Sequence, residues 1–200
     1  GKRVIYDAEH FFDGWRDDPA YALECLRAAA DAGAENVTLC DTNGSSLPPQ
    51  VAEATAAVVA ELDIAVGIHT HNDLECGVAN SLAGVEAGAS LVQGTMNGIG
   101  ERTGNANLTS ILPALQLKLG HEVVSDDQLS RLTGIAHFVD ELLNRTPEPA
   151  QPYVGRNAFA HKGGMHVAGV NADALRPTKG CSGLGVTFRS SSTKWAMPVS

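Results

Sequence analysis

The chain has 200 residues, 44% of them apolar, which fits one soluble globular domain with a sizeable core. Its formal charge of −9 argues against nucleic acid or an anionic membrane as a partner. No apolar run approaches the roughly 20 residues that cross a bilayer, and no signal peptide heads the chain. The cysteines are dispersed without a CxxC pair, so we expect free thiols in a cytoplasmic protein: Cys25, Cys40, Cys76 and Cys181.

The first 120 residues repeat one pattern. Short β-rich runs at residues 4–6, 36–40, 64–68 and 90–93 alternate with Ala-rich segments of helical spacing at residues 19–32, 48–61, 77–87 and 107–119. Proline stands at the first turn of two of these helices, and glycine follows the end of three. Strands that alternate with helices form parallel βαβ units, so the pattern predicts a TIM barrel or a doubly wound sheet.

Polar residues at the strand ends favour the barrel. TIM-barrel enzymes place their chemistry at the C-terminal ends of successive strands, whereas a Rossmann sheet concentrates glycines after its first strand. We therefore predict an α/β fold made of four units of a (β/α)8 TIM barrel. Four units cannot close eight strands, and the chain begins with Gly1, so we expect a piece of a longer protein. The polar clusters are Asp7 with Glu9 and His10, then Asp41 to Asn43, His69 to Asp73, and Thr95 with Asn97.

Two histidines close the third predicted strand. Side chains on a strand alternate between its faces, so His69 and His71 point the same way. Such a pair can bind a metal ion, because imidazole is the commonest metal ligand in proteins. For an isolated HxH motif, however, the more frequent explanation is two polar residues that hydrogen-bond to the backbone at a strand end.

The character of the sequence changes after Gly120. Ser125 can cap a helix that runs through residues 126–143, with apolar residues at three-four spacing. Residues 146–152 contain three prolines and predict a linker, and residues 157–166 form a glycine-broken stretch with two histidines. We expect the half-barrel at 1–120, the helix and linker at 121–150, the start of an arm at 151–175, and an irregular tail at 176–200.

Four motifs carry a resemblance to a known family: residues 41–44, 69–73, 94–105 and 158–166. In this order they resemble the isopropylmalate, homocitrate and citramalate synthases, which belong to the DRE-TIM metallolyases. The resemblance covers residues 4–172, and the match over residues 94–105 is the most specific. The opening Tyr6 to Gly14 is most similar to the citramalate synthase branch. Residues 176–200 depart from the family pattern.

The resemblance implies barrel strands five to eight and a divalent metal, Zn²⁺, Mn²⁺ or Mg²⁺. The implied ligands are His69, His71 and the amide oxygen of Asn105, although an asparagine there could instead cap the next helix. Asn72 and Asp73 would then orient these ligands without binding the metal. The family's Arg-Asp-Glu strand, with a further Asp ligand, would lie outside this chain. Glu101 and Arg102 are expected to pair within their loop.

The resemblance also implies a reaction, a Claisen condensation of acetyl-CoA with a 2-oxo acid, pyruvate in the citramalate branch. Glu9 matches a glutamate near the substrate, and Thr42 matches a threonine that binds the 2-oxo-acid carboxylate, although it also lies in a strong turn sequence. His166 is expected to be a catalytic residue on an arm that crosses to the neighbouring subunit of a homodimer. The alternatives are isopropylmalate or homocitrate synthesis, an acyl-CoA lyase or aldolase on the same barrel, and a fragment without activity.

Overall fold

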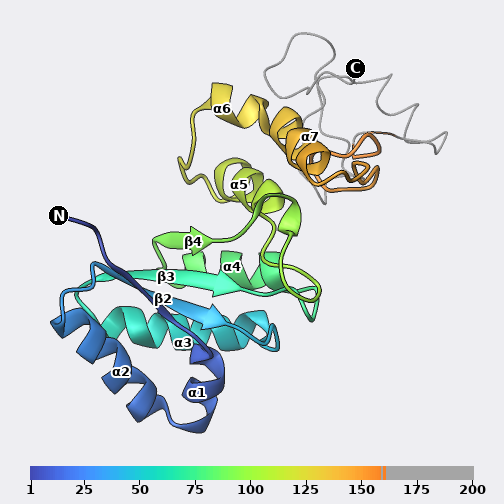
Figure 1. The fold of residues 1–200 in the computed structure, drawn as a ribbon. Helices are drawn as coiled ribbons and strands as arrows, with labels where there is room; N and C mark the ends of the chain where they lie inside the picture. The colour runs from blue at the N-terminus through green and yellow to red at the C-terminus, as the bar shows by residue number, and fades with distance from the viewer. Residues whose placement is uncertain (159, 161–200) are drawn as a thin grey trace. The chain divides into compact units, whose positions relative to one another are not determined.

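The computed structural model describes residues 1–158 and residue 160. Its centre is a sheet of four parallel strands in the order β1-β2-β3-β4 (Figure 1). The strands are β1 (Ile5–Ala8), β2 (Asn36–Asp41), β3 (Ala65–Thr70) and β4 (Leu91–Gln93). A doubly wound sheet reverses its strand order at a switch point. Here each strand is added beside its predecessor, which is the order of consecutive units in a TIM barrel.

Helices connect the strands and cover one face of the sheet (Figure 1). They are α1 (Phe11–Asp17) and α2 (Pro19–Asp31) after β1, α3 (Pro48–Glu61) after β2, and α4 (Gly77–Glu86) after β3. The caps follow from the sequence. Asp18 accepts a hydrogen bond from the Tyr21 N–H at 3.1 Å and Pro19 occupies the first helical position, so α2 begins there.

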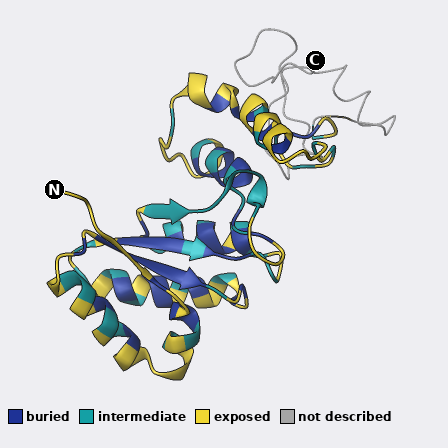
Figure 2. Cartoon of the chain, viewed as in Figure 1, coloured by how far each residue is buried: buried dark blue, intermediate teal, exposed yellow. Residues whose placement is uncertain are grey.

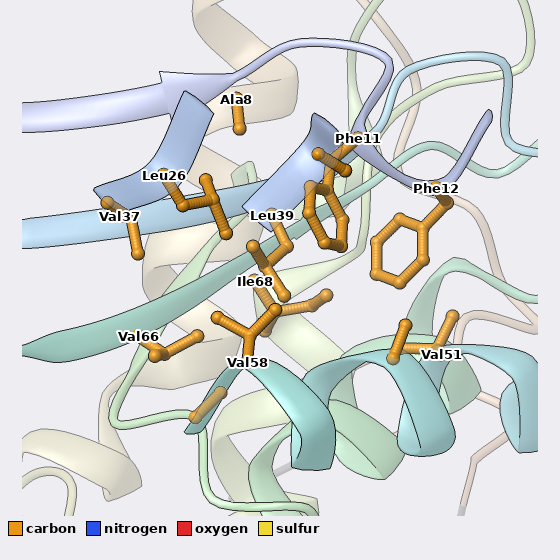
Figure 3. Close-up of a cluster of buried hydrophobic side chains, with 13 residues drawn as sticks. Ala8, Phe11, Phe12, Leu26, Val37, Leu39, Val51, Val58, Val66 and Ile68 are labelled. Atoms are coloured by element: carbon orange, nitrogen blue, oxygen red, sulfur yellow. The ribbon is translucent and has the colours of Figure 1, made fainter. Parts of the chain in front are cut away.

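The main core lies between the sheet and these helices (Figure 3). Val51, Ala54 and Val58 of α3 are fully buried at three-four spacing and face the sheet. Val37 and Leu39 of β2 and Ile68 of β3 meet them and are likewise fully buried. Figure 2 shows the consequence, because the central strands β2 and β3 are mostly buried while the outward sides of the helices are exposed.

The other face of the sheet is concave and polar. Neighbouring strands lie about 4.8 Å apart, so the outer two of four strands would be about 14 Å apart in a flat sheet. Nevertheless, the Nε2 atom of Gln93 on β4 donates to the Asp7 Oδ1 atom on β1 at 2.8 Å. Two short polar side chains span that distance only if the sheet curls, as a barrel segment does.

The chain divides into two compact units, residues 1–111 and 112–200. After the 3-10 turn η1 (Met96–Gly98), helix α5 (Leu108–Leu117) runs across this division. The second unit continues with α6 (Asp126–Ser130) and α7 (Leu132–Leu142). Ser125 caps α6 through a capping box with Gln128, with hydrogen bonds of 2.9 and 3.2 Å.

The four predicted strands and the four predicted helices of the first 120 residues are confirmed, with ends shifted by at most two residues. Two predictions were incomplete. Helix α1 was missed, and the helix expected over residues 126–143 is two helices, because the chain leaves helical geometry between Ser130 and Leu132. The expected domain boundary at residue 120 remains a prediction.

Candidate active site

The two histidines lie at the C-terminal end of β3, on the concave side of the sheet. His69 is inside the strand, opposite Cys40 on β2 and Gln93 on β4, and His71 follows the strand end. Their ring centres are 5.3 Å apart with an interplanar angle of 47°. Two imidazoles that share one ion at about 2.1 Å per nitrogen have ring centres roughly 5 Å apart, so the spacing suits a shared metal.

Asn105 reaches the same place from the loop after β4. It forms an isolated antiparallel bridge with His71, so the two side chains lie next to each other on one side of the backbone. Its Nδ2 donates to the Ile99 carbonyl at 3.3 Å. Asn105 does not cap the following helix, because Asn107 accepts the Thr109 N–H at 2.9 Å and does so instead. The helix-cap explanation for Asn105 is therefore wrong.

Two buried polar atoms here have no hydrogen-bond partner among the described residues. They are His71 Nδ1 and Asn105 Oδ1. Burial, followed by the neighbouring His69 and Arg102, lowers the pKa of His71, which favours a neutral ring with a free lone pair. A buried acceptor without a partner costs about 1–3 kcal/mol, so two side by side suit a cation that accepts both lone pairs. The residues thus fit a divalent metal.

The described residues do not by themselves supply a complete ligand set. Within residues 1–158 and 160, no three His, Cys, Asp or Glu side chains come together as a metal site. The two histidines and the Asn105 oxygen would therefore leave coordination positions open to substrate, water or a carboxylate from outside the described residues.

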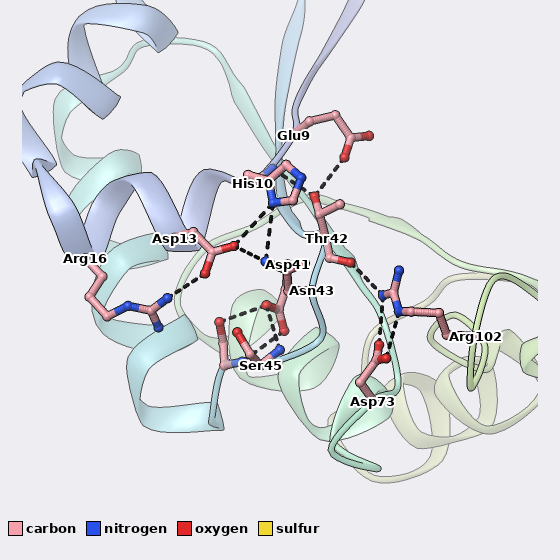
Figure 4. A network of polar contacts seen from close by, with 11 residues as sticks. Glu9, His10, Asp13, Arg16, Asp41, Thr42, Asn43, Ser45, Asp73 and Arg102 are labelled. Carbon is pink, nitrogen blue, oxygen red and sulfur yellow. Dashed lines mark hydrogen bonds and ion pairs between the residues drawn. The ribbon is translucent and has the colours of Figure 1, made fainter.

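Thr42 and Glu9 meet at the ends of β2 and β1 (Figure 4). The Thr42 hydroxyl donates to Glu9 Oε2 at 2.7 Å and accepts the His10 backbone N–H at 2.8 Å. A hydroxyl has one proton to give, and here Glu9 holds it. The two residues, selected separately in the sequence, therefore act as one hydrogen-bonded unit.

Arg102 fastens the loops that carry these residues (Figure 4). Its Nε and one terminal nitrogen make a bidentate pair with the Asp73 carboxylate, both at 2.8 Å, and that nitrogen also donates to the Thr42 carbonyl at 2.7 Å. These hydrogen bonds hold the pKa of Asp73 below its usual value. Gly44 faces Asp73 with φ of 58°, and a Cβ there would clash with the carboxylate. Arg102 does contact Glu101, at 3.6 Å, but Asp73 is its main partner.

A buried polar cluster supports the Thr42 turn from beneath. Asp41, 2% exposed, accepts hydrogen bonds from the Ser46 hydroxyl at 2.9 Å and from the Ser45 N–H at 3.2 Å. Asn80 of α4 donates to the Ser46 carbonyl at 2.8 Å. Asn72 accepts the Gly77 N–H at 3.1 Å and so fixes the start of α4. Asn72 and Asp73 make their hydrogen bonds with the loops, and their role toward metal ligands stays a prediction.

Asp13 of α1 ties this helix to the same turn. It accepts from Asn43 Nδ2 at 2.7 Å and from Arg16 at 2.5 Å, and it lies 3.3 Å from His10 Nδ1. Burial alone would raise the pKa of Asp13, but the hydrogen bonds from His10, Asn43 and Arg16 outweigh it and lower the pKa. The sequence reasoning did not identify Asp13, because its link to the Thr42 turn is made through Asn43, which lies 30 residues away at a separate strand end.

Gln93 is the second residue that the sequence reasoning missed. Its Oε1 lies 2.9 Å from His69 Nδ1, and its Nε2 donates to Asp7 at 2.8 Å and approaches Thr38 Oγ1 at 3.4 Å. A glutamine at a strand end gives little signal on its own. The signal lies in the register, which places Gln93 directly opposite His69.

The predicted catalytic residue His166 lies outside the described residues, as do the tail and all of the predicted arm except residues 151–158 and 160. Cys25, Cys40 and Cys76 are free thiols, as predicted. In the part of the chain that the structure describes, no helix is long and apolar enough to cross a membrane.

Comparison with known proteins agrees with these observations. The family model described as HMGL-like matches residues 6–139. An (R)-citramalate synthase from Aquifex aeolicus is 56% identical over 172 residues, which make up 86% of this chain and 33% of that protein. One from Geobacter sulfurreducens is 54% identical over 167 residues, 84% of this chain and 32% of that protein. The chain thus spans about a third of the length of the curated relatives it matches.

Among solved structures, an HMG-CoA lyase from Acenitobacter baumannii, in complex with coenzyme A and 3-methylmalate, superposes with a TM-score of 0.58. The superposition covers 72% of this chain and 48% of that one, at 24% sequence identity. At this identity the likeness concerns the fold alone.

Proposed function

Because the chain belongs to the HMGL-like family, we propose that it forms strands five to eight of a TIM barrel that condenses acetyl-CoA with a 2-oxo acid. The family match and the citramalate synthases more than 50% identical to it support a condensing transferase. The polar, concave face and the residues gathered at the strand ends support an active site there. The rest of the barrel would come from residues outside this chain.

The observation that carries the proposal is the pair of buried polar atoms without partners, His71 Nδ1 and Asn105 Oδ1. With His69 they would hold a divalent ion, Zn²⁺, Mn²⁺ or Mg²⁺. When bound, such an ion polarises the ketone of the 2-oxo acid as a Lewis acid. The protein residues do the remaining work: they orient the substrate, neutralise its carboxylate and move a proton.

Thr42 and Glu9 would bind the substrate and move the proton. A substrate carboxylate needs a donor, and the Thr42 hydroxyl can serve only by turning its proton away from Glu9. The same movement frees the Glu9 carboxylate to act on the acetyl methyl group, with His166 as a further candidate base. Arg102 would keep Thr42 in place through its carbonyl.

Pyruvate is the proposed 2-oxo acid, and (R)-citramalate or its enantiomer the product class. The identities of 54% and 56% to two (R)-citramalate synthases support this choice. In the full-length protein, a thiol-release assay with acetyl-CoA should show faster turnover with pyruvate than with 2-oxoisovalerate or 2-oxoglutarate. Faster turnover with 2-oxoisovalerate would replace the proposal with isopropylmalate synthesis.

The metal part is tested without turnover. Zn²⁺ and Mn²⁺ titrations of the 200-residue chain should show binding that His71→Ala abolishes and that Asn105→Ala weakens. His137→Ala is the matched control, since His137 is an exposed histidine of α7. Equal metal content in the wild type and His71→Ala, by elemental analysis, would refute the assignment.

Two further features are proposed on the resemblance alone. One is a homodimer in which the arm around His166 enters the neighbouring subunit, and the other is an acetyl-CoA site completed by residues beyond this chain. A His166→Gln variant mixed with a variant defective at His71 should recover activity if the arm is exchanged, because the mixed dimers then contain one intact site. Failure to recover activity despite mixed dimers would exclude exchange.

A further inference from the structure

Gln93 connects three strands across the concave face of the sheet. Its side chain joins His69 on β3 to Asp7 on β1, although it originates on β4. The Thr38 hydroxyl of β2 lies 3.4 Å from Gln93 Nε2 and gives its own proton to Asn36 Oδ1 at 2.8 Å. A lone pair of Thr38 therefore faces the second proton on the Gln93 nitrogen.

These contacts fix the direction of each hydrogen bond. An ionised carboxylate only accepts, so the Gln93 nitrogen must face Asp7 and its oxygen must face His69. If the amide were reversed, its oxygen would meet the Asp7 carboxylate and two lone pairs would oppose each other. Because an amide oxygen only accepts, the His69 nitrogen that contacts it must carry the proton.

We propose that Asp7 and Gln93 are positioning residues that set the tautomer of His69. They hold its proton on Nδ1 and leave the lone pair of Nε2 free. The hydrogen bond to Gln93 also restrains the ring orientation, as hydrogen bonds to metal-bound histidines do. The tautomer assignment stands on the hydrogen bonds alone, whereas its use for metal binding rests on the proposed function.

Gly67 leaves the space that this arrangement occupies. It pairs with Thr38 on β2 and lies two residues before His69 on the same face of β3. A Cβ at this position would lie 2.6 Å from Thr38 Oγ1 and 3.0 Å from Asn36 Oδ1. Any side chain here would displace the threonine that contacts Gln93, so the open face over Gly67 is a requirement of the network.

The test is the tautomer itself, measured by two-bond ¹H–¹⁵N correlation spectra of the metal-free chain with labelled histidine. The signals of His69 are assigned as those that disappear from the spectrum of the His69→Gln variant. The wild type should show a protonated Nδ1 and an unprotonated Nε2. Gln93→Met, which keeps the length and removes both hydrogen bonds, should move the population toward the Nε2–H form. A wild-type ring with its proton on Nε2 would overturn the inference.

A double variant separates positioning from packing. Asp7→Asn with Gln93→Glu exchanges the amide and the carboxylate. The carboxylate at position 93 would then accept the hydrogen bond from His69, and the amide at position 7 would donate to that carboxylate. This pair should restore the Nδ1–H form that Gln93→Met loses. If the double variant keeps the wild-type spectral dispersion but lacks the Nδ1–H form, the proposed role of Asp7 and Gln93 would be contradicted.

Zn²⁺ affinity distinguishes this inference from the proposed function. Gln93→Met should weaken Zn²⁺ binding about tenfold to a hundredfold, and the double variant should recover most of it. Suppose that His69 has the Nδ1–H tautomer in the wild type and loses it in Gln93→Met, but Zn²⁺ does not bind. The positioning role of Asp7 and Gln93 then holds, and only the metal proposal fails. If Gln93→Met changes neither the His69 tautomer nor the Zn²⁺ affinity, the proposed positioning role is wrong.

Discussion

His71 and Asn105 show how the site differs from an ordinary strand end. Their buried acceptor atoms lack partners within the described residues, and each such atom costs about 1–3 kcal/mol. Nearby polar groups of the fold, such as Asp41 and Asn72, do have partners. Thr55 Oγ1 and Asn80 Oδ1 are also buried without a partner among the described residues, but His71 and Asn105 face each other across a backbone bridge, where one bound ion would relieve the cost of both.

Cys40 illustrates the opposite case, a thiol whose surroundings suppress its ionisation and therefore its reactivity. It is 1% exposed, and burial, followed by the charges of Glu9 and Asp7, raises the pKa of its thiol to about 12. At pH 8 only about one thiol in ten thousand would then be ionised. We expect iodoacetamide at pH 8 to alkylate the half-buried Cys25 and Cys76 well before Cys40, as peptide mass spectrometry would show.

The control for this prediction is unfolding. In urea all three thiols should react at similar rates, because the burial that raises the Cys40 pKa is lost. Alkylation of native Cys40 at the rate of Cys25 would contradict the prediction.

At the scale of elements, helix α1 depends on Asp13. Because the folded-state pKa of Asp13 is lowered, its contribution to stability is present above the unfolded pKa of about 3.9 and is lost as the pH falls through the folded value. Asp13→Asn should cost up to about 1 kcal/mol at pH 7 and much less near pH 3. Urea unfolding of both proteins at the two pH values measures this.

Asp17→Asn provides the comparison for Asp13. It removes an exposed carboxylate from the last position of the same helix, so it tests whether any charge change on α1 has the same effect. A pH-independent difference between the wild type and Asp13→Asn would show that the carboxylate does not stabilise the turn.

The sequence predicted the long, periodic elements well, and the exceptions have physical reasons. Helix α1 has only seven residues, about two turns, and starts after His10 in a left-handed conformation, so it offers only a short periodic pattern and no usual cap. The residue between α6 and α7 is Arg131, and an arginine does not signal a helix end as a proline or glycine would. Both are decided by tertiary packing rather than by local preference.

The candidate site was predictable in the same uneven way. His69, His71 and Thr42 follow strands and stand in short motifs, so their positions could be inferred from the chain order. Asp13, Gln93 and the pairing of Arg102 with Asp73 depend on which loops meet in space. Local sequence does not contain that information.

At the scale of the whole molecule, no described residue pairs with the outer edges of β1 and β4, so the sheet has two open edges in this part of the chain. An open edge exposes unpaired backbone groups that can pair with another chain. Apolar residues add to this on and before β1, where Val4, Ile5 and Tyr6 are 53%, 46% and 38% exposed. We therefore expect the 200-residue chain alone to self-associate, as light scattering after size exclusion would show.

Ile5→Lys should reduce this association, because a lysine at an edge opposes pairing. Tyr21→Lys removes an apolar residue of α2 that is even more exposed, at 65%, and should leave association unchanged. A stable monomeric wild type would contradict the prediction. We also expect no acetyl-CoA-dependent thiol release from the chain alone, since its described residues lack a full ligand set.

The hydrogen bond between Gln93 and Asp7 also has a consequence for the order of folding. It joins residues 86 positions apart, and closing such a loop in an unfolded chain costs about 4 kcal/mol of entropy. One hydrogen bond cannot offset that cost, so the contact forms only after β1 to β4 have docked. In stopped-flow experiments, Gln93→Met should accelerate unfolding and leave the refolding rate nearly unchanged, so the site is completed after the main folding barrier.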